Sequence, residues 1–588
     1  MSHQLVRTCC LFMLILGFFL PASANGGGAI KTNLSRTSST LADFPAVDPN
    51  YIYDQLFYMV TSFQHREAGY DNNLPVSVNG HDEFAAYWTQ EMLNDLQGFG
   101  PQVLRDPFPI QGWRGRPAVV PAFNVEISVP GVTHPEQVVV IGCHYDGEAV
   151  STQSANDDGS GCAIELGVAK AMAQYWRSHH LYPARTLRFV IFDAEEQGLF
   201  GSFHYLNSTI NGDVQNIVAM FNEEQNGIAY PLRFLGEMAY PLLPFYIYLT
   251  PLTNNNLYTR QSKLPQQQRE KIAQFRTLMQ QAIPAVFAQF QALGFQTLTY
   301  HGNNGLDFPQ PIFTPDQLSY IQQEDDNGVG SDQIPFTLAG IPCATFVGNS
   351  TYYDHNPPPP PWSYPYDQKQ DTIQLMNIYA NDSSQKALAL ELSLALPGML
   401  TTWMLNQPSI LGQASADNNP IAAISDIGQL QPGQNIAFDA RASFDPNSSS
   451  ALAYSWDFGD GSIASGITIN HIYTTPGNYK LTLTVSSSTD GKRTVSKLIT
   501  VNKQATIYPN PFANYHATGY PAPNPLVMLP TLNDTGKVSI TPTPTTLVFT
   551  SSKGITGLTL ILIIGTGLLV ALLVVGIFLV ILSRRQQV

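Results

Sequence analysis

Three clusters of acidic and histidine residues stand along one strand–loop–helix–strand stretch of this sequence. They are His144-Tyr145-Asp146, Asn156-Asp157-Asp158 and Asp193-Ala194-Glu195-Glu196. The first and third clusters end the apolar runs 138–143 and 187–192, and the second precedes a predicted helix over 161–177. A β–α–β order predicts two parallel strands in a covered sheet. Open α/β sheets place their sites where such strands end, so the stretch predicts a functional site.

The composition indicates a globular protein of several domains. The chain has 588 residues, of which 44% are hydrophobic and 11% aromatic. The net charge of −15 argues against nucleic acid as a partner, because a polyanion is repelled by an acidic surface. Charged residues make up only 12% of the chain, so we expect uncharged polar residues on its surface.

Both ends of the chain carry predicted export and membrane signals. Residues 1–24 are typical of a secretory signal peptide, with Arg7, an apolar run and a small-residue cleavage site. Residues 555–582 are uncharged and long enough to span a bilayer as one helix. Arg584 and Arg585 follow, which predicts a cytoplasmic C-terminus. We therefore expect a single-pass membrane protein whose catalytic domain is extracytoplasmic, either periplasmic or on the cell surface.

The cysteines predict no complete disulfide framework. Cys9 and Cys10 lie in the predicted leader, which leaves Cys143, Cys162 and Cys343 in apolar contexts. An odd number cannot be fully paired within one chain, and we expect buried free thiols.

Residues 45–404 form the predicted catalytic domain. Helical spacing occurs at 51–60, 84–96, 161–177, 266–293 and 383–404. Strand patterns occur at 124–130, 138–143, 187–192, 217–221 and 341–346. These elements predict an α/β fold with a mostly parallel sheet covered by helices. We interpret residues 228–325 as an insertion over the C-terminal edge of the sheet, where it could act as a lid.

The rest of the chain is predicted to connect this domain to the membrane. Residues 406–418 read as a polar linker, and short alternating strands predict an all-β sandwich over 419–502. Its Trp456-Asp457-Phe458-Gly459-Asp460-Gly461 run and its Tyr473–Tyr479 segment resemble polycystic-kidney-disease (PKD) domains. The resemblance implies a spacer or adhesion unit that could make cell-surface contacts. The Pro- and Thr-rich residues 503–552 are typical of an extended stalk.

The three clusters contain the groups that a two-metal hydrolytic site requires. Such a site needs a bridging carboxylate, terminal ligands and a base that takes a proton from water. Asp157 can bridge, His144 can bind through one ring nitrogen, and Asp146 can orient that imidazole. Glu195 and Glu196 are adjacent, so they point in different directions and can divide the base and ligand roles.

These residues resemble the di-zinc aminopeptidase family, which also includes glutamate-carboxypeptidase-like, transferrin-receptor-like and glutaminyl-cyclase proteins. The resemblance covers residues 45–404 and rests on four motifs in order: His144-Tyr145-Asp146, Asp157-Asp158-Gly159-Ser160-Gly161, Glu195 to Ser202, and Asp371-Thr372. It implies a zinc-exopeptidase fold and two bound divalent ions, zinc in the family. It also implies that His144 binds one ion, Glu196 the other, Asp157 both, and that Glu195 is the general base.

Several positions depart from the family pattern. The family has an aspartate ligand where this chain has Glu223 and Glu224, and the Asn-Xaa-Asp form of the motif favours Glu224. A family histidine is replaced by Asp367, and Ser331-Asp332-Gln333 replaces a more usual Ser-Asp-His. The carboxylate of Asp367 adds negative charge, which favours harder ions such as manganese or cobalt. His355 is an alternative ligand.

We therefore predict a metallo-aminopeptidase that removes N-terminal residues from peptide substrates. Two alternatives remain open on the same scaffold: a catalytically inactive binding protein, as transferrin-receptor-like relatives are, and a glutaminyl cyclase.

Overall fold

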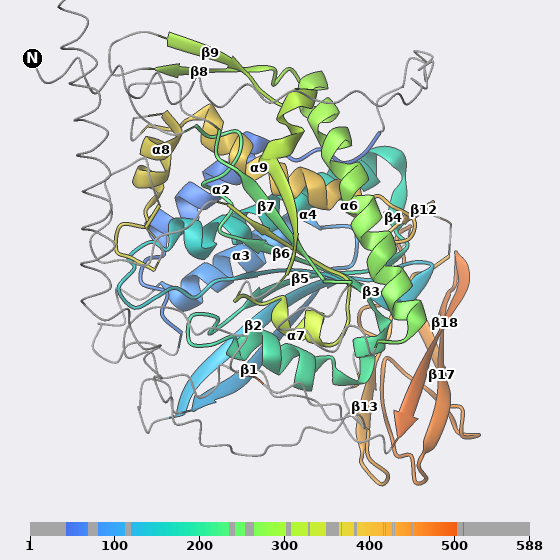
Figure 1. Ribbon diagram of the computed structural model, residues 1–588. Coiled ribbons are helices and arrows are strands. Elements are labelled where there is room, and N and C mark those ends of the chain that lie inside the picture. Colours follow the sequence, from blue (N-terminus) through green and yellow to red (C-terminus); the bar gives the residue numbers. More distant parts are fainter. Residues whose placement is uncertain are drawn as a thin grey trace, which may run out of the picture. The chain divides into compact units, whose positions relative to one another are not determined.

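The computed structural model (Figure 1) describes residues 43–68, 80–111, 119–233, 242–252, 264–301, 307–326, 330–348, 364–365, 367–381, 385–415, 417, 419–425, 427, 430–447, 451–501 and 510. The predicted signal peptide, most of the stalk, the predicted membrane helix 555–582 and His355 lie outside these residues. Those predictions are therefore not tested by the structure.

The first described part is an α/β domain built on an eight-stranded mixed sheet. The strand order is β1-β2-β5-β3-β6-β11-β7-β10. The bounds are β1 Gln102–Gln111, β2 Val119–Val129, β3 His134–His144, β5 Arg185–Phe192, β6 Ile217–Glu224, β7 Phe245–Leu249, β10 Ile321–Asp325 and β11 Cys343–Val347. The central strands β5, β3, β6 and β11 are parallel, as expected.

Four of the seven pairings in the sheet are parallel, including β10 with β7 at one edge, so the sheet is mostly parallel as expected, with antiparallel pairings in its outer parts. β1 and β2 pair antiparallel with each other, β2 pairs antiparallel with β5, and β7 pairs antiparallel with β11. β1 and β2 follow one another along the chain, and a short connection between neighbouring strands permits only antiparallel pairing. The edges of the sheet are therefore mixed, whereas the centre keeps the parallel arrangement.

Helices cover both faces of the sheet (Figure 1). The larger layer contains α2 (Pro49–Ser62), α3 (His81–Asp95), α4 (Ser160–His179), α6 (Gln266–Ala292), α8 (Ile373–Asn381) and α9 (Leu388–Leu405). The opposite face packs against α7 (Ile334–Leu338) and the turn Tyr205–Thr209. Strand side chains alternate between the layers: Ile141 joins the first core and Val140 the second.

Two segments are more integrated into the domain than the sequence suggested. Residues 228–325 supply β7 and β10 to the main sheet, so they are not solely an insertion over its edge. Their long helix α6 packs against α9. Residues 406–418 contain β12 (Gln413–Ser415), which pairs with β4 (Leu181–Pro183) instead of forming only a linker.

Helix α9 is the central helix of the larger layer. Among the described residues it alone is long and apolar enough to cross a membrane by length and composition. Its apolar window is 94% buried inside the protein, and it packs against α2, α4 and α6. The hydrophobicity of α9 is thus accounted for by core packing, since a helix that is apolar all round is buried.

The second described part is a β-sandwich. A two-stranded sheet, β13 (Ile436–Asp439) with β16 (Thr468–His471), accompanies a four-stranded sheet in the order β15-β14-β17-β18. These four strands are β14 Ala453–Asp457, β15 Ile463–Ser465, β17 Gly477–Ser487 and β18 Gly491–Val501. Trp456, Phe458 and Tyr473 of the predicted motifs are buried in its core. The motif residues therefore have a packing role.

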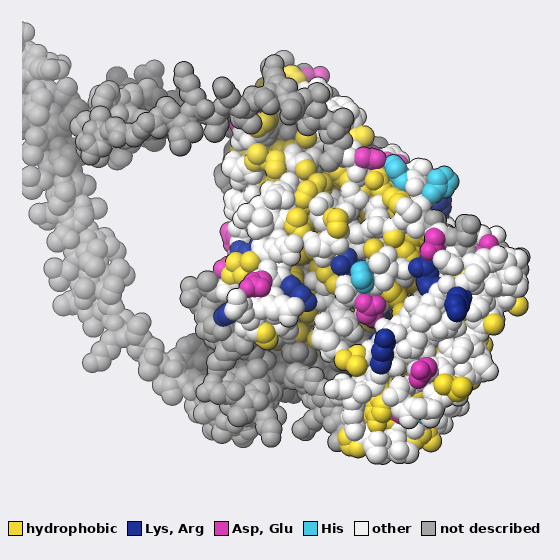
Figure 2. Space-filling model, turned by 90° about the vertical axis from the view of Figure 1, so that its right-hand side faces the viewer, with side chains coloured by type: hydrophobic (Ala, Val, Ile, Leu, Met, Phe, Trp, Pro, Cys, Tyr) yellow, Lys and Arg dark blue, Asp and Glu magenta, His cyan; other side chains and the backbone are white. Residues whose placement is uncertain are grey.

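The described surface carries few charges. Figure 2 shows one face on which acidic and basic side chains stand scattered among uncharged and apolar atoms. This agrees with the low charged fraction of 12%.

Candidate metal centre

The carboxyl ends of the central parallel strands bring the three sequence clusters together. His144 is the last residue of β3, and Glu224 is the last residue of β6. Glu195 and Glu196 follow the end of β5, and Asp157 lies in the turn before α4. Adjacent parallel strands end at the same edge, so residues distant in sequence meet there.

The potential ligand atoms form two sets that share one residue. His144, Asp157 and Glu224 make the first set, and Asp157, Glu196 and Asp367 make the second. Within each set all ligand atoms lie within 4.8 Å of one another. The imidazole Nε2 of His144 is 3.0 Å from Asp157 Oδ1 and 3.8 Å from Glu224 Oε1. The five predicted ligands are therefore close together, with Asp157 between the two sets.

Two buried oxygens in this cluster fit a cation. Asp157 and Asp367 are 5% and 7% exposed, and Asp157 Oδ2 and Asp367 Oδ1 have no hydrogen-bond partner among the described residues. A buried carboxylate oxygen without a donor is costly unless a positive charge or a ligand compensates it. The donor set, one imidazole with four carboxylates, suits divalent ions.

The structure distinguishes between the two adjacent glutamates of β6. Glu224 points to His144, and its carboxylate accepts hydrogen bonds from Ser331 Oγ at 2.5 Å and Gln225 Nε2 at 3.0 Å. Glu223 points the other way and accepts a hydrogen bond from Thr401 Oγ1 of α9 at 2.7 Å. Strand alternation therefore leaves only Glu224 in the cluster. Ser331 of the altered Ser-Asp-Gln segment orients it.

Asp146 joins the first and third sequence clusters. Its Oδ1 lies 3.4 Å from His144 Nδ1 and accepts the backbone N–H of Glu195 at 3.1 Å. Its Oδ2 accepts the N–H of Glu196 at 3.3 Å. The imidazole Nδ1 of His144 hydrogen-bonds to the backbone carbonyl oxygen of Asp146 at 3.2 Å, so Asp146 orients the imidazole and its carboxylate fixes the turn that carries both glutamates.

Two further aspartates hold the turn that contains Asp157. Asp371 accepts hydrogen bonds from the backbone N–H groups of Asn156 and Asp157 at 2.9 and 3.0 Å. Asp158 accepts the N–H of Gly161 at 2.9 Å and that of His144 at 3.3 Å. Asp158 and Asp371 belong to two of the sequence motifs. Motif membership alone does not show that their carboxylates hold the backbone of the turn.

Arg66 is a positioning residue that the sequence analysis did not single out. It is 2% exposed, and its guanidinium donates to the carbonyl oxygens of Tyr145 at 2.8 Å, Gln153 at 2.6 Å and Ser154 at 3.0 Å. It therefore connects the end of β3 with the loop before Asp157. No motif marks Arg66, because its partners are main-chain carbonyls from distant segments.

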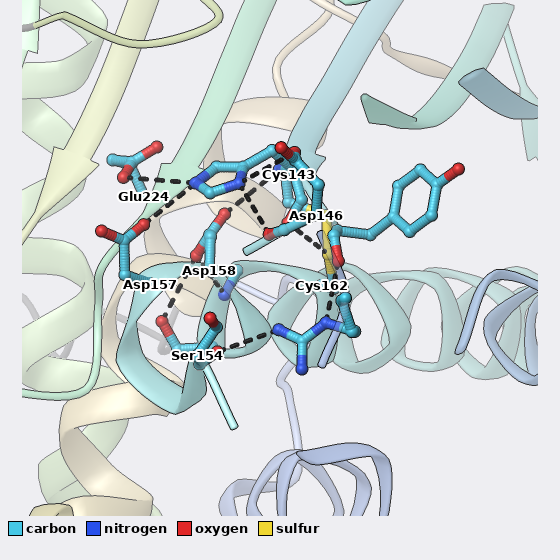
Figure 3. The surroundings of a disulfide bond; sticks show 12 residues. Cys143, Asp146, Ser154, Asp157, Asp158, Cys162 and Glu224 are labelled. Atoms are coloured by element: carbon cyan, nitrogen blue, oxygen red, sulfur yellow. Dashed lines mark hydrogen bonds and ion pairs between the residues drawn. A yellow bond between two sulfur atoms is a disulfide. The ribbon is translucent and has the colours of Figure 1, made fainter. Parts of the chain in front are cut away.

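A disulfide bond lies directly behind the cluster and corrects the expectation of free thiols. Cys143 and Cys162 are bonded, with their Cα atoms 5.5 Å apart, whereas Cys343 is a buried free cysteine. Cys143 precedes His144, and Cys162 lies in the first turn of α4, which packs back over β3. Figure 3 shows the disulfide near Asp146, with Asp157 and Glu224 on the other side of the imidazole of His144 and pointing toward it.

The electrostatics of the two sets differ. Burial alone would lower the pKa of His144, but surrounding carboxylates, Glu195 first, raise it well above its usual range. Burial opposes ionisation of Glu224, yet its hydrogen bond and attraction to His144 lower its pKa. In the second set, burial and then mutual repulsion raise the pKa values of Glu196 and Asp367 well above normal. His144 also lowers the pKa values of Glu196 and Asp367, but for these two residues its effect is smaller than that of burial and of the neighbouring carboxylates.

Comparison with known proteins supports both sequence resemblances. Residues 124–326 match peptidase family M28, and residues 417–502 match the PKD domain. The human carboxypeptidase Q is 40% identical over 87 residues, which is 14% of this chain and 17% of that protein. Aminopeptidase YwaD of Bacillus subtilis is 30% identical over 99 residues, or 17% of this chain and 20% of that protein. The matched parts thus span about a fifth or less of these relatives.

Solved structures give low overall similarity. BSAP, a zinc aminopeptidase from Bacillus subtilis, is 14% identical with a TM-score of 0.39, and the match covers 62% of this chain and 96% of that chain. Porphyromonas gingivalis glutaminyl cyclase is 17% identical with a TM-score of 0.37, and the match covers 61% of this chain and 98% of that chain. From the sequence profiles, a peptidase family M28 segment and a PKD domain are both detected in this chain.

Proposed function

We propose that this chain is a metal-dependent exopeptidase, most specifically an aminopeptidase, that hydrolyses N-terminal residues from peptides. The supporting observation is the pair of ligand sets that share Asp157, with Glu195 beside them on the turn after β5. Hydrolysis at a two-metal site needs these components: paired cation positions and a carboxylate that moves a proton.

The side chains divide these roles by position. His144 and Glu224 would hold one divalent ion, Glu196 and Asp367 the other, and Asp157 would contact both. Ions at these positions supply Lewis acidity that polarises the peptide carbonyl and lowers the pKa of a bound water. Zinc is the ion named for BSAP, the Bacillus subtilis aminopeptidase that resembles this chain.

Glu195 is the general base in this proposal. Its backbone N–H is fixed by Asp146 while its side chain remains partly exposed at the site. Burial and the neighbouring carboxylates raise the pKa of Glu195 well above its ordinary value, with the positive charge of His144 acting in the opposite direction. A carboxylate held in this way can take a proton from the attacking water and return it to the leaving amine.

We further propose that the catalytic domain works outside the cytoplasm, anchored by residues 555–582, with the PKD domain and the stalk as spacers. The apolar stretch before Arg584 and Arg585 and the N-terminal segment 1–24 support this arrangement. Protease added to intact cells should remove the catalytic domain and leave the C-terminus protected. Protection of the catalytic domain in intact cells would contradict the orientation.

The activity is tested by comparing three forms of the purified protein on amino-acid anilides and on a peptide with N-terminal glutamine. The wild type should hydrolyse the anilides. Glu195→Gln should lose about 10²–10⁴-fold in kcat, because the amide cannot accept the proton, while retaining its bound metal. Glu223→Gln is the matched control, since Glu223 faces α9 and not the cluster.

Each other outcome identifies an alternative. Cyclisation of the glutamine peptide without anilide hydrolysis would indicate a glutaminyl cyclase. Metal binding with no turnover by the wild type on either substrate would indicate a binding protein. Equal anilide turnover by the wild type and Glu195→Gln would refute the assigned base.

A further inference from the structure

We infer that the two metal positions prefer different ions: zinc at the position of His144, Asp157 and Glu224, and a harder divalent ion such as manganese at the position of Asp157, Glu196 and Asp367. The inference rests on the proposed metal centre and adds the identity of the ion at each position. It predicts a mixed-metal site instead of two equivalent zinc ions.

The two sets differ in the kind of atom that they offer a metal ion. The first set offers one imidazole nitrogen and two carboxylates, whereas the second offers carboxylate oxygens only. Imidazole suits zinc, while all-oxygen shells suit harder ions such as manganese, magnesium and calcium. Among the residues that the structure describes, no histidine or cysteine joins the second set.

The two sets also differ in negative charge. When ionised, the second set contributes three negative charges, and the first set contributes two beside a neutral imidazole. In the part of the chain that the structure describes, Asp367 Oδ1 and Asp157 Oδ2 have no hydrogen-bond donor, although both residues are more than nine-tenths buried. The second position therefore has charge and free oxygen atoms to offer a cation that binds through electrostatics more than through covalent softness.

The ligand side chains of the first set are held by more hydrogen bonds than those of the second set. In the first set, Ser331 and Gln225 hold both oxygens of Glu224, and Asp146 lies 3.4 Å from the other ring nitrogen of His144. Such fixed ligands favour a closed geometry of low coordination number, as zinc adopts. In the second set, one oxygen of Glu196 accepts the N–H of Glu148 at 3.0 Å, and Asp367 Oδ1 accepts no hydrogen bond from any residue that the structure describes. Free carboxylate oxygens permit the larger shell of a hard ion.

The experiment measures metal content and the manganese spectrum of the purified full-length chain. Metal is removed with a chelator, and the protein is titrated with zinc alone, with manganese alone and with an equimolar mixture. Zinc alone should fill one position tightly and the second at least about tenfold more weakly. The mixture should give one zinc and one manganese per chain, with an electron paramagnetic resonance signal of bound manganese.

Asp367→His is the diagnostic variant, and Glu148→Gln is the matched control because it removes a nearby carboxylate outside both sets. Asp367→His should bind the second zinc about tenfold more tightly and lose the bound-manganese signal in the mixture. Glu148→Gln should behave as the wild type. If Asp367→His does not fold, the titrations of the wild type decide the question alone.

Two results would overturn the inference. The first is two equally tight zinc ions in the wild type that manganese does not replace. The second is loss of the second zinc in His355→Ala, which would show that a nitrogen ligand completes that position. Glu195-dependent hydrolysis with two tight zinc ions would refute only the mixed site. Mixed occupancy without hydrolysis would refute only the proposed activity.

Discussion

Two groups of charged residues at the same edge of the sheet differ in how fully their polar atoms are hydrogen-bonded. The first group is the ligand cluster: His144, Asp157, Glu196, Glu224 and Asp367. Within it, buried oxygens of Asp157 and Asp367 have no hydrogen-bond donor among the residues described.

The second group is the supporting residues: Arg66, His81, Asp158, Asp193 and Asp371. Each of these side chains hydrogen-bonds to backbone or to a charged partner. The supporting residues therefore stabilise the fold, whereas the ligand cluster keeps free oxygens at the positions proposed for the cations. Buried polar groups are normally satisfied, so unsatisfied ones at a strand edge indicate where a ligand binds.

Glu165 of α4 shows that an unpaired buried carboxylate alone does not mark the site. Neither of its oxygens has a hydrogen-bond partner among the described residues, yet it lies outside both ligand sets. Burial, and then the nearby Glu223, raise the pKa of Glu165 well above its ordinary value. Glu165 stands apart from the ligand atoms, whereas the ligand cluster brings several carboxylates and an imidazole together in sets whose atoms lie within 4.8 Å of one another.

We expect Asp157→Asn to have the largest effect of the substitutions that test the difference between the ligand cluster and the supporting residues. This change should reduce the affinity for both ions by more than the about 10–100-fold typical of an outer-shell partner, because Asp157 belongs to both sets. The metal-free variant should unfold at the same or a higher temperature than the metal-free wild type, since one repelling carboxylate is removed. Metal analysis and thermal unfolding check this. Retention of one tight ion would show that Asp157 does not bridge.

Arg66→Met should lower the stability of the metal-free protein, whereas Asp157→Asn should not. The Arg66 variant should destabilise the metal-free protein by about 3–5 kcal/mol, because three buried carbonyl oxygens lose their donor and nearby carboxylates lose a cation. Denaturant unfolding of the metal-free protein measures the loss. Arg105→Met is the control, since the Arg105 side chain is 60% exposed. Equal stability of both variants would contradict a structural role for Arg66.

His81, one of the supporting residues, should make the free energy of unfolding depend on pH. Burial alone would lower its pKa, but Asp193, with Nε2 to Oδ1 at 2.9 Å, and then Asp82 raise it to about 9 from 6.5. The pKa is raised in the folded state, so the stabilisation is complete below about 6.5 and is lost as the pH rises through about 9. About 3 kcal/mol should disappear over this window.

Unfolding free energies of the metal-free protein at pH 6.5 and 9.5 measure this loss. His81→Gln should be less stable than the wild type at pH 6.5 and should change less between the two pH values. The exposed His134→Gln is the control. If His81→Gln keeps the full pH dependence of the wild type, the protonated His81–Asp193 pair is not its source.

Much of the fold and of the site was accessible from local patterns. The apolar runs before His144 and Asp193 predicted adjacent parallel strands, and β3 and β5 pair in that way. The helices predicted at 51–60, 84–96 and 266–293 correspond to α2, α3 and α6. Residues His144, Asp157, Glu196, Glu224 and Asp367 were named from motif order, and the structure brings them together.

Other features depended on contacts between distant segments. The Cys143–Cys162 disulfide requires α4 to pack back over β3, which an odd cysteine count could not reveal. β7 and β10 enter the sheet by pairing with strands far along the chain, although their segment resembled an insertion. Arg66 binds main-chain carbonyls, which leave no side-chain pattern.

The sequence by itself determined the chemistry of this protein, because residue type and spacing place acids and a histidine at the ends of buried strands. Tertiary structure alone decided which of the two glutamates of β6 faces His144, which carboxylates lie within reach of one another, and which charges only support the turns. The physical reason is that pairing and packing, which join segments remote along the chain, set the direction of each side chain and the donors within its reach.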